Sequence, residues 1–227
     1  MRDHELAADT AALARFFLGP PDEVVAASWK EATGTPLDLA HARQDYYDYF
    51  CIPQSGCFIP PYAHVLTRSQ EIEDFWHFPA PRYDGGDALL PWYDVAGFDP
   101  IKAAFDPLLK GTNQPLDHIG FILAFLANLI DVANGTSDRD RSIVAEFLVE
   151  HVLPWTRFLP SLLLKADSPY VVGLGSALRD WTDAMLAAYP VGTMQLPAPT
   201  SEVPRNAEAD ELPCGASAGF AHVLPQG

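Results

Sequence analysis

Basic side chains are scarce in this sequence. Its 227 residues include 14 Lys and Arg against 30 Asp and Glu, which gives a formal net charge of −16 at pH 7. Such a surface repels phosphate backbones, so we expect no nucleic-acid partner. It would attract a basic segment of another protein, although a high net charge serves solubility first. The charge alone therefore leaves both a basic partner and plain solubility open.

Cysteine and long apolar runs are also few. Three cysteines, an odd number, do not indicate a disulfide framework. The longest apolar run, Ile119–Ile130, is interrupted by Asn128. It is too short to span a bilayer and is typical of a buried helix. The polar, acidic start Met1–Glu5 is unlike a secretory signal. We therefore expect a cytoplasmic protein that does not insert into membranes.

Signatures of catalysis are absent from the sequence. It contains no G-x-S-x-G nucleophile elbow, no P-loop and no H-E-x-x-H motif. The segment Val171–Gly175 is similar to the start of a dinucleotide fingerprint. However, Leu178 stands at the third glycine position and no βαβ pattern surrounds the segment. These residues instead predict a helix whose two glycines allow another helix to pack closely. The sequence thus favours a protein that is not an enzyme.

A metal site has an incomplete set of ligands. Cys51 and Cys57 would need two further ligands to bind zinc, and His64 or His77 could supply them. The sequence has no C-x-x-C, and the residues between the two cysteines lack metal-site spacing. We expect free cysteines, because free cysteine often behaves as a small buried hydrophobe. No metal and no cofactor are predicted.

Apolar residues recur at helical spacing through almost the whole chain, which predicts an all-α protein with no sheet. Proline and glycine divide this pattern into a bundle of roughly eight to ten helices. Thr35 and Pro36 are predicted as the N-cap and first residue of a helix that ends near Phe50. Three further boundaries are predicted in the same way, namely caps at Ser137 and Ser168 and a break at Pro154.

Residues 78–100 contain four prolines and three glycines, which break any long period. We predict a long irregular hinge there, joining an N-terminal lobe of about residues 1–77 to a C-terminal lobe of about residues 101–190. The two lobes form a single all-α domain, 1–190. Such a hinge makes a domain-swapped dimer an alternative to a monomer. Residues 191–227 have five prolines, no lysine and little periodicity, so we predict a mobile tail.

Four short motifs carry the most specific information in the sequence. Tyr46–Phe50 reads as the aromatic end of a helix, Pro60–Val65 as a proline-rich loop, and Asn113–His118 as a turn that opens the most apolar helix. Phe147–Trp155 combines aromatic residues with a histidine and a proline. In this order, on a helical chain of this length, the motifs resemble those of the TorD/DmsD/NarJ family of redox-enzyme maturation chaperones.

The resemblance runs from about Leu6 to Tyr189 and includes departures. Ala63-His64 replaces a Glu-Ser pair of the family, and Gln114 stands where a glutamate is common. The resemblance implies an all-α chaperone that binds the apo catalytic subunit of a molybdenum oxidoreductase related to dimethyl-sulfoxide reductase. Family members often bind the twin-arginine leader of this client and hold the client until its molybdopterin cofactor is inserted.

We place a client-binding groove between the helix end at Tyr46–Phe50, the Pro60–Tyr62 loop and the Asp117–His118 turn. Polar and aromatic residues interrupt plain helical packing there, and they coincide with the motifs. We expect Asp117 to pair with a cationic group of the client and the aromatic and proline side chains to contact an apolar segment. The predicted client-binding residues are Tyr46, Tyr49, Phe50, Pro61, Tyr62, Trp92, Pro115, Asp117, His118, His151, Pro154 and Trp155.

Other interpretations of the same residues stay open. Asp117 in the first turn of a helix favours the helix dipole without any ligand. Adjacent helical residues point about 100° apart, so Asp117 and His118 do not form a natural dyad. A generic helical adaptor that binds some other peptide would have the same surface. A small hydrolase that uses Asp117, His118 and His151 would need a nucleophile, and the sequence marks none.

Overall fold

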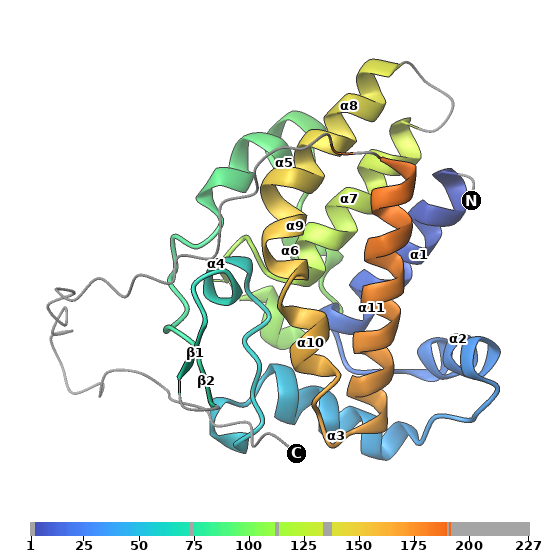
Figure 1. Cartoon of the computed structure of the whole chain (residues 1–227), viewed down its shortest axis with the longest axis vertical. Helices are drawn as coiled ribbons and strands as arrows, with labels where there is room; N and C mark the ends of the chain where they lie inside the picture. Colours follow the sequence, from blue (N-terminus) through green and yellow to red (C-terminus); the bar gives the residue numbers. More distant parts are fainter. Residues whose placement is uncertain (1–2, 73–74, 112–113, 134–137, 190, 192–227) are drawn as a thin grey trace, which may run out of the picture.

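Helices make up most of the described chain, which confirms the predicted all-α class. The computed structural model describes residues 3–72, 75–111, 114–133, 138–189 and 191 (Figure 1). Predictions that concern Asn113, the cap at Ser137 and the tail after Val191 lie outside these residues. Within the described ranges, no helix combines the length and the apolar character needed to cross a membrane.

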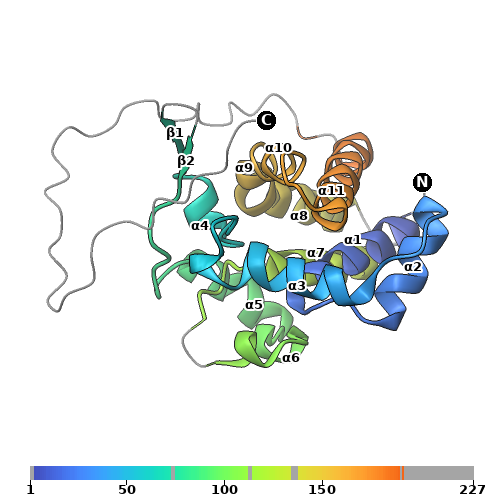
Figure 2. The ribbon, with the colours of Figure 1, turned by 90° about the horizontal axis from the view of Figure 1, so that it is seen from below.

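Three long helices form the centre of the molecule, namely α1 (Asp3–Leu18), α7 (Ile119–Ala133) and α11 (Pro169–Ala188). α1 packs along α7 and also contacts α11 (Figures 1 and 2). α7 is buried on nearly every side over its first three turns. The longest apolar run of the sequence is therefore the buried helix that its length and composition predict.

Shorter helices surround this centre. α3 (Leu39–Phe50) and α10 (Leu159–Leu163) pack against α11, and α2 (Glu23–Thr33) joins α1 to α3. The remaining short elements near the candidate site are η1 (Pro53–Ser55), α4 (Ala63–Leu66), α6 (Pro100–Ala103) and η3 (Pro107–Lys110). One hydrophobic core runs from Leu6 to Tyr189. It crosses both predicted lobes, and the division into lobes stays a prediction.

A two-stranded antiparallel sheet corrects the prediction that the protein has no sheet. β1 (Gln70–Ile72) pairs antiparallel with β2 (Phe75–His77), with Gln70 opposite His77. Strands of three residues are too short to show the alternation of apolar and polar residues that predicts a strand. The sequence pattern therefore could not reveal this pairing.

The start of α3 also differs from the prediction. Asp38, and not Thr35, is the N-cap, and its side chain accepts hydrogen bonds from two backbone N–H groups of the first turn. The N–H of Thr35 instead donates to the hydroxyl of Thr33 at the end of α2. Aspartate is a stronger N-capping residue than threonine, so the helix begins after Asp38 and not after Thr35. At α11 the prediction is confirmed, with Ser168 as N-cap and Pro169 in the first turn.

The predicted hinge contains ordered structure. It includes η2 (Asp87–Leu89) and α5 (Leu90–Ala96), so the prediction of an irregular connection is wrong for this part. Pro91 lies in the first turn of α5, where a missing N–H costs nothing, and it opens a helix instead of breaking one. Tyr93 is buried, and its hydroxyl donates to the carbonyl oxygen of Leu116 at 3.1 Å.

The break predicted at Pro154 takes the form of a widened helical turn. α8 (Asp138–Phe147) continues as a π-helix (Leu148–Val152), and α9 (Leu153–Thr156) follows with Pro154 in its first turn. Proline removes a backbone N–H, and its ring clashes with the carbonyl four residues earlier. A π-turn accommodates both effects without ending the helical path. Trp155 therefore stays fully buried in the core.

Gly175 is needed for the close contact between α10 and α11. A Cβ at this position would lie 2.8 Å from the Cβ of Leu163 and 3.1 Å from the backbone N of Leu164. Overpacking costs about 1–3 kcal/mol, and the gain in helix propensity returns about 1 kcal/mol. We expect Gly175→Ala to lower the free energy of unfolding by about 1 kcal/mol, measured by denaturant unfolding.

Gly173→Ala is the matched control on the same helix. A Cβ there would meet the outer ring of Trp29, a half-buried side chain that can turn aside. The loss of stability should therefore be smaller than for Gly175→Ala. Equal losses would show that the spacing of α10 and α11 does not depend on Gly175.

Candidate functional site

The proline-rich loop after α3 lies against the turn that precedes α7. The N–H of Ala63 donates to the carbonyl oxygen of Asp117 at 3.0 Å. Tyr62 and His118 form an antiparallel β-bridge beside this bond. Two motifs that are far apart in the sequence are thus brought together by their backbones.

Asp117 is bound by the side chain and backbone of His64. The backbone N–H of His64 donates to Asp117 Oδ2 at 2.5 Å, and His64 Nδ1 lies 2.9 and 2.8 Å from Oδ1 and Oδ2. The backbone N–H of Arg82 donates to His64 Nε2 at 3.0 Å. These partners place the ring proton on Nδ1, which donates to the carboxylate. The Asp117 side chain is only 5% exposed, so its acceptor capacity is directed inward.

Two glycines allow the chain to cross closely over this pair. A Cβ on Gly85 would lie 2.3 Å from the His64 ring, and a Cβ on Gly86 would lie 2.4 Å from the backbone N of Asp117. Gly86 also has a φ of +86°, which side-chain-bearing residues rarely adopt. The carbonyl of Gly85 accepts the N–H of Leu116 at 3.0 Å. The start of the predicted hinge is therefore fixed onto the His64–Asp117 pair.

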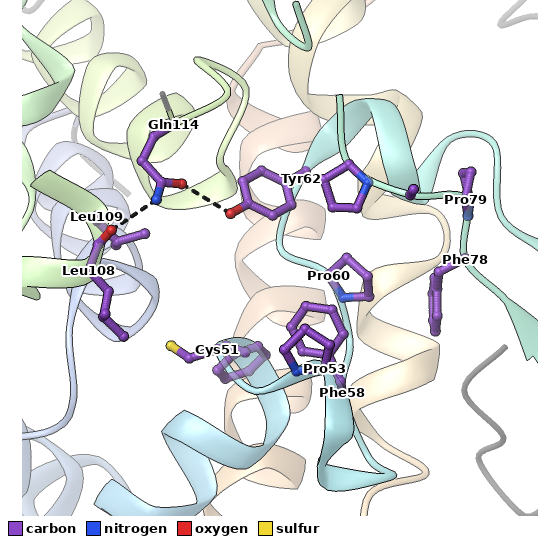
Figure 3. A pocket seen from close by; sticks show the side chains of 13 residues that line it. Cys51, Pro53, Phe58, Pro60, Tyr62, Phe78, Pro79, Leu108, Leu109 and Gln114 are labelled. Carbon is purple, nitrogen blue, oxygen red and sulfur yellow. Dashed lines mark hydrogen bonds between the residues drawn. The ribbon is translucent and has the colours of Figure 1, made fainter. Parts of the chain in front are cut away.

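An apolar hollow of about 200 Å³ opens on one side of the proline-rich loop (Figure 3). Phenylalanine, proline and leucine side chains form most of its wall, and Tyr62 and Gln114 supply its polar groups. Burial raises the pKa of Tyr62 to about 12, so its hydroxyl remains protonated near neutral pH. The lining residues of this apolar hollow are Phe50, Cys51, Pro53, Phe58, Pro60, Tyr62, Phe78, Pro79, Ala80, Pro81, Leu108, Leu109 and Gln114.

A second hollow, also of about 200 Å³, contains the His64–Asp117 pair and is called the histidine hollow below. Burial lowers the pKa of His151, which favours the neutral imidazole. Glu150 beside it is half exposed. The hollow is therefore lined by the exposed carboxylate of Glu150 and by the imidazole rings of His64 and His151. Its lining residues are Ala63, His64, Thr67, Gly86, Ala88, Leu89, Asp117, Ile122, Glu150, His151, Pro154 and Trp155.

His118 lies in the core and not on either hollow. Its side chain is 1% exposed, and its Nδ1 accepts the backbone N–H of Gly120 at 3.2 Å. Burial lowers the pKa of this histidine to about 3. The ring is therefore neutral near pH 7, with its proton on Nε2. Its arrangement is that of a structural residue at the start of α7.

The structure divides the predicted client-binding residues into three groups. Phe50 and Tyr62 line the apolar hollow. Four others line the histidine hollow, namely Asp117, His151, Pro154 and Trp155. The rest lie in or against the core beside these hollows, namely Tyr46, Tyr49, Pro61, Trp92, Pro115 and His118.

Much of the predicted aromatic face thus packs inside the protein. Tyr46 is 1% exposed and donates to the carbonyl oxygen of Phe17, and Trp155 is 0% exposed. Direct contact of these two side chains with a client would require the core to open. The carboxylate of Asp117 already binds His64. Its pairing with a cationic group of the client would have to compete with this bond, and it stays a prediction.

Sequence reasoning missed most of the apolar hollow's second wall. Phe78–Pro81 was assigned to the hinge, and Leu108–Leu109 carries no motif. His64 is expected from the sequence only as a replacement within the loop motif or as a zinc ligand, whereas the structure shows it as the partner of Asp117. A histidine that replaces a serine in the loop motif, together with an aspartate in the turn motif, is the signal that could have suggested this pair.

The comparison with known families agrees with the four motifs. A family model described as nitrate reductase delta subunit matches residues 3–159, which covers the loop, the turn, the π-helix and both hollows. Searches of curated proteins and of solved structures found no match. The family match confirms the resemblance to the TorD/DmsD/NarJ chaperones. The chain therefore belongs to the nitrate reductase delta subunit family, whose members are NarJ/TorD-type chaperones for the maturation of molybdenum enzymes.

Proposed function

We propose that this chaperone binds the apo catalytic subunit of a molybdenum oxidoreductase of the dimethyl-sulfoxide reductase type and holds it until the cofactor is inserted, before export. Where the client carries a twin-arginine leader, the leader is the segment bound. The observation that carries the proposal is the apolar hollow, which is built around Tyr62 of the loop motif. The chain's own contribution is to bind and shield a client segment, and no catalytic step is assigned to it.

The apolar hollow suits an apolar segment of a client for two physical reasons. Aromatic and proline walls are rigid, so burying apolar area against them costs little side-chain entropy. The hydroxyl of Tyr62 and the amide of Gln114 lie at its rim and are already hydrogen bonded to protein groups. An apolar ligand therefore leaves no polar group of the rim without a partner.

The charge of the chain suits the basic end of such a segment. The formal net charge is −16, and the half-exposed Glu150 lines the histidine hollow. Long-range attraction of this kind speeds encounter more than it strengthens the final complex. The hydrolase alternative gains no support, because His118 is buried and its Nδ1 is occupied.

Leu108→Asp tests the role of the apolar hollow. Leu108 lines the hollow and is 59% exposed, so a charge there leaves the core intact. Burying an apolar side chain in an interface contributes about 1.5–3 kcal/mol, and about 1.4 kcal/mol is one decade of affinity. We expect Leu108→Asp to weaken binding of the apo catalytic subunit by about tenfold or more, measured by titration calorimetry.

Val24→Asp is the matched control for added charge on an exposed apolar site. Val24 is 70% exposed on α2, on the opposite side of the molecule from α4 (Figure 1). The Val24→Asp variant should bind the client as tightly as the parent does. The client is identified first, as a molybdenum oxidoreductase subunit that co-purifies with the tagged parent, and we expect Leu108→Asp to lose it. Equal retention of that subunit by both variants would place the client elsewhere on the surface.

A further inference from the structure

The two walls of the apolar hollow are joined by the side chain of Gln114 (Figure 3). Its Nε2 donates to the carbonyl oxygen of Leu108 at 2.8 Å, and its Oε1 accepts the hydroxyl of Tyr62 at 3.2 Å. Leu108 belongs to η3, whereas Tyr62 belongs to the proline-rich loop. One amide thus bridges two segments that are separated in the sequence.

The orientation of this amide is fixed by its partners. A backbone carbonyl oxygen can only accept, so the NH₂ group must face Leu108. The amide oxygen then faces Tyr62, whose hydroxyl must donate. Burial keeps this hydroxyl protonated near neutral pH by raising its pKa to about 12. The chain of donors and acceptors therefore has a single direction, and it needs both a donor and an acceptor at position 114.

The bridge acts on an exposed part of the hollow's wall. Leu108 is 59% exposed, and Phe105, just before η3, is 55% exposed. Tyr62 on the other side is half-buried and packs edge to face on His118, with ring centroids 5.4 Å apart. The amide thus ties the segment of the exposed Leu108, whose neighbour Leu109 lies in the core, to the packed Tyr62.

We propose that Gln114 is a positioning residue for client binding, which holds the Leu108 wall beside Tyr62 and thereby keeps the apolar hollow shaped for an uncharged apolar segment. This inference rests on the proposed function. Gln114 need not contact the client itself, because its effect passes through the two residues to which it is bonded.

Gln114→Glu removes the bridge with almost no change of shape. The carboxylate can still accept from Tyr62, but it places a second acceptor against the Leu108 carbonyl oxygen. Charge alone predicts the opposite outcome for binding, because an added negative charge attracts a basic peptide. Lys110→Gln is the matched control: it makes the same change in net charge at an exposed residue in the same η3 wall, without touching the amide bridge.

The experiment uses the full chain and a synthetic peptide of about twenty residues that has two arginines followed by an apolar run. Titration calorimetry near neutral pH should show binding to Gln114→Glu weakened by about five- to tenfold, the effect of one lost hydrogen bond. Lys110→Gln should bind as tightly as the parent or more tightly. Melting temperatures within a few degrees of the parent show that both variants are folded.

A pH profile separates positioning from a general structural effect. Protonation of the new glutamate, whose ordinary pKa is about 4.3, restores a donor toward Leu108. The deficit of Gln114→Glu, measured against the parent at the same pH, should therefore shrink as the pH is lowered to about 4.3. If the loss of peptide affinity in Gln114→Glu did not change with pH, the hydrogen bond from Gln114 to Leu108 would not be its cause.

The outcomes distinguish this inference from the proposed function. If the parent binds the peptide and Gln114→Glu binds it as tightly as Lys110→Gln does, the positioning role of Gln114 is overturned and the proposed function stands. If the parent does not bind the peptide, the apolar segment is not the ligand of the hollow. Both the leader-binding step and the role of Gln114 are then overturned.

Discussion

Replacing Asp117 by alanine is expected to lower the melting temperature by about 5–15 °C, from a loss of about 2–4 kcal/mol. The substitution leaves the backbone N–H and the Nδ1–H of His64 without their acceptor. Hydrogen bonds to charged acceptors contribute about 1.5–3 kcal/mol each, and an unsatisfied buried donor adds its own desolvation cost. The His64 side chain is 15% exposed, so water can offset part of this loss. Calorimetric melting measures the shift.

Asp84→Ala is the control for loss of a nearby carboxylate. Asp84 pairs with Arg82 on the surface, with a side chain that is 54% exposed. Exposed ion pairs contribute little to stability, so its melting temperature should stay close to that of the parent. Hydrogen exchange should also accelerate around α4 in Asp117→Ala before it changes in α1. Equal melting temperatures for the two variants would show that Asp117 does not pin the proline-rich loop.

Acid is expected to destabilise the protein between about pH 6.5 and about pH 3, largely through His118. Burial lowers the pKa of His118 in the folded state to about 3, whereas an unfolded histidine titrates near 6.5. Between these values the unfolded state binds a proton that the folded state does not. The free energy of unfolding therefore falls as the pH falls, by up to about 1.4 kcal/mol per pH unit for this group. The lowered pKa of His151 acts in the same direction.

His118→Asn isolates this contribution. Its amide oxygen can still accept the N–H of Gly120, as Nδ1 does in the parent, but the side chain does not titrate. Denaturant unfolding across the same pH interval should show a slope that is shallower by up to about 1.4 kcal/mol per pH unit. His41→Asn, on the exposed face of α3, is the control and should keep the slope of the parent. An unchanged slope in His118→Asn would mean that His118 is not the buried neutral group described above.

The fold class and the long helices could be predicted from the sequence because each depends on local patterns. The apolar run of α7, the cap at Ser168 and the close approach at Gly173 and Gly175 are all readable in a short window. The two-stranded sheet was not predictable, because three-residue strands are defined by pairing and not by alternation. Asp38 was overlooked as the cap of α3 because Thr35-Pro36, three residues earlier, is also a start signal for a helix.

The candidate site was predictable only in part, since it depends on contacts between distant segments. The motifs correctly indicated that the loop at Tyr62 and the turn at Asp117 belong together. They did not indicate that Leu108 completes the apolar hollow, because no local pattern links η3 to the loop. The sequence predicts Trp155 and Tyr46 as binding residues, but both side chains are buried in the core. Large aromatic residues are common in protein cores as well as in binding sites.

The role of Asp117 illustrates the same limit. A carboxylate before an apolar helix is compatible with a ligand contact, with a helix-dipole effect and with a structural bond. The structure adds His64 as its partner, with a backbone N–H of Arg82 behind the ring. Through these bonds, the Asp117 carboxylate connects the turn to the proline-rich loop, and the His64 ring connects both to the segment at Arg82. Any contact with a client cation would compete with that connection.

The most direct test of this account is the molybdenum content of the client catalytic subunit purified from cells that contain the parent chaperone, Leu108→Asp or Val24→Asp. We expect a nearly full complement of molybdenum per client subunit with the parent and with Val24→Asp. We expect a content several-fold lower with Leu108→Asp, close to that in cells without the chaperone. Equal molybdenum content in all of these cells, with every variant present at the level of the parent, would contradict the claim that the apolar hollow serves maturation of a molybdenum enzyme.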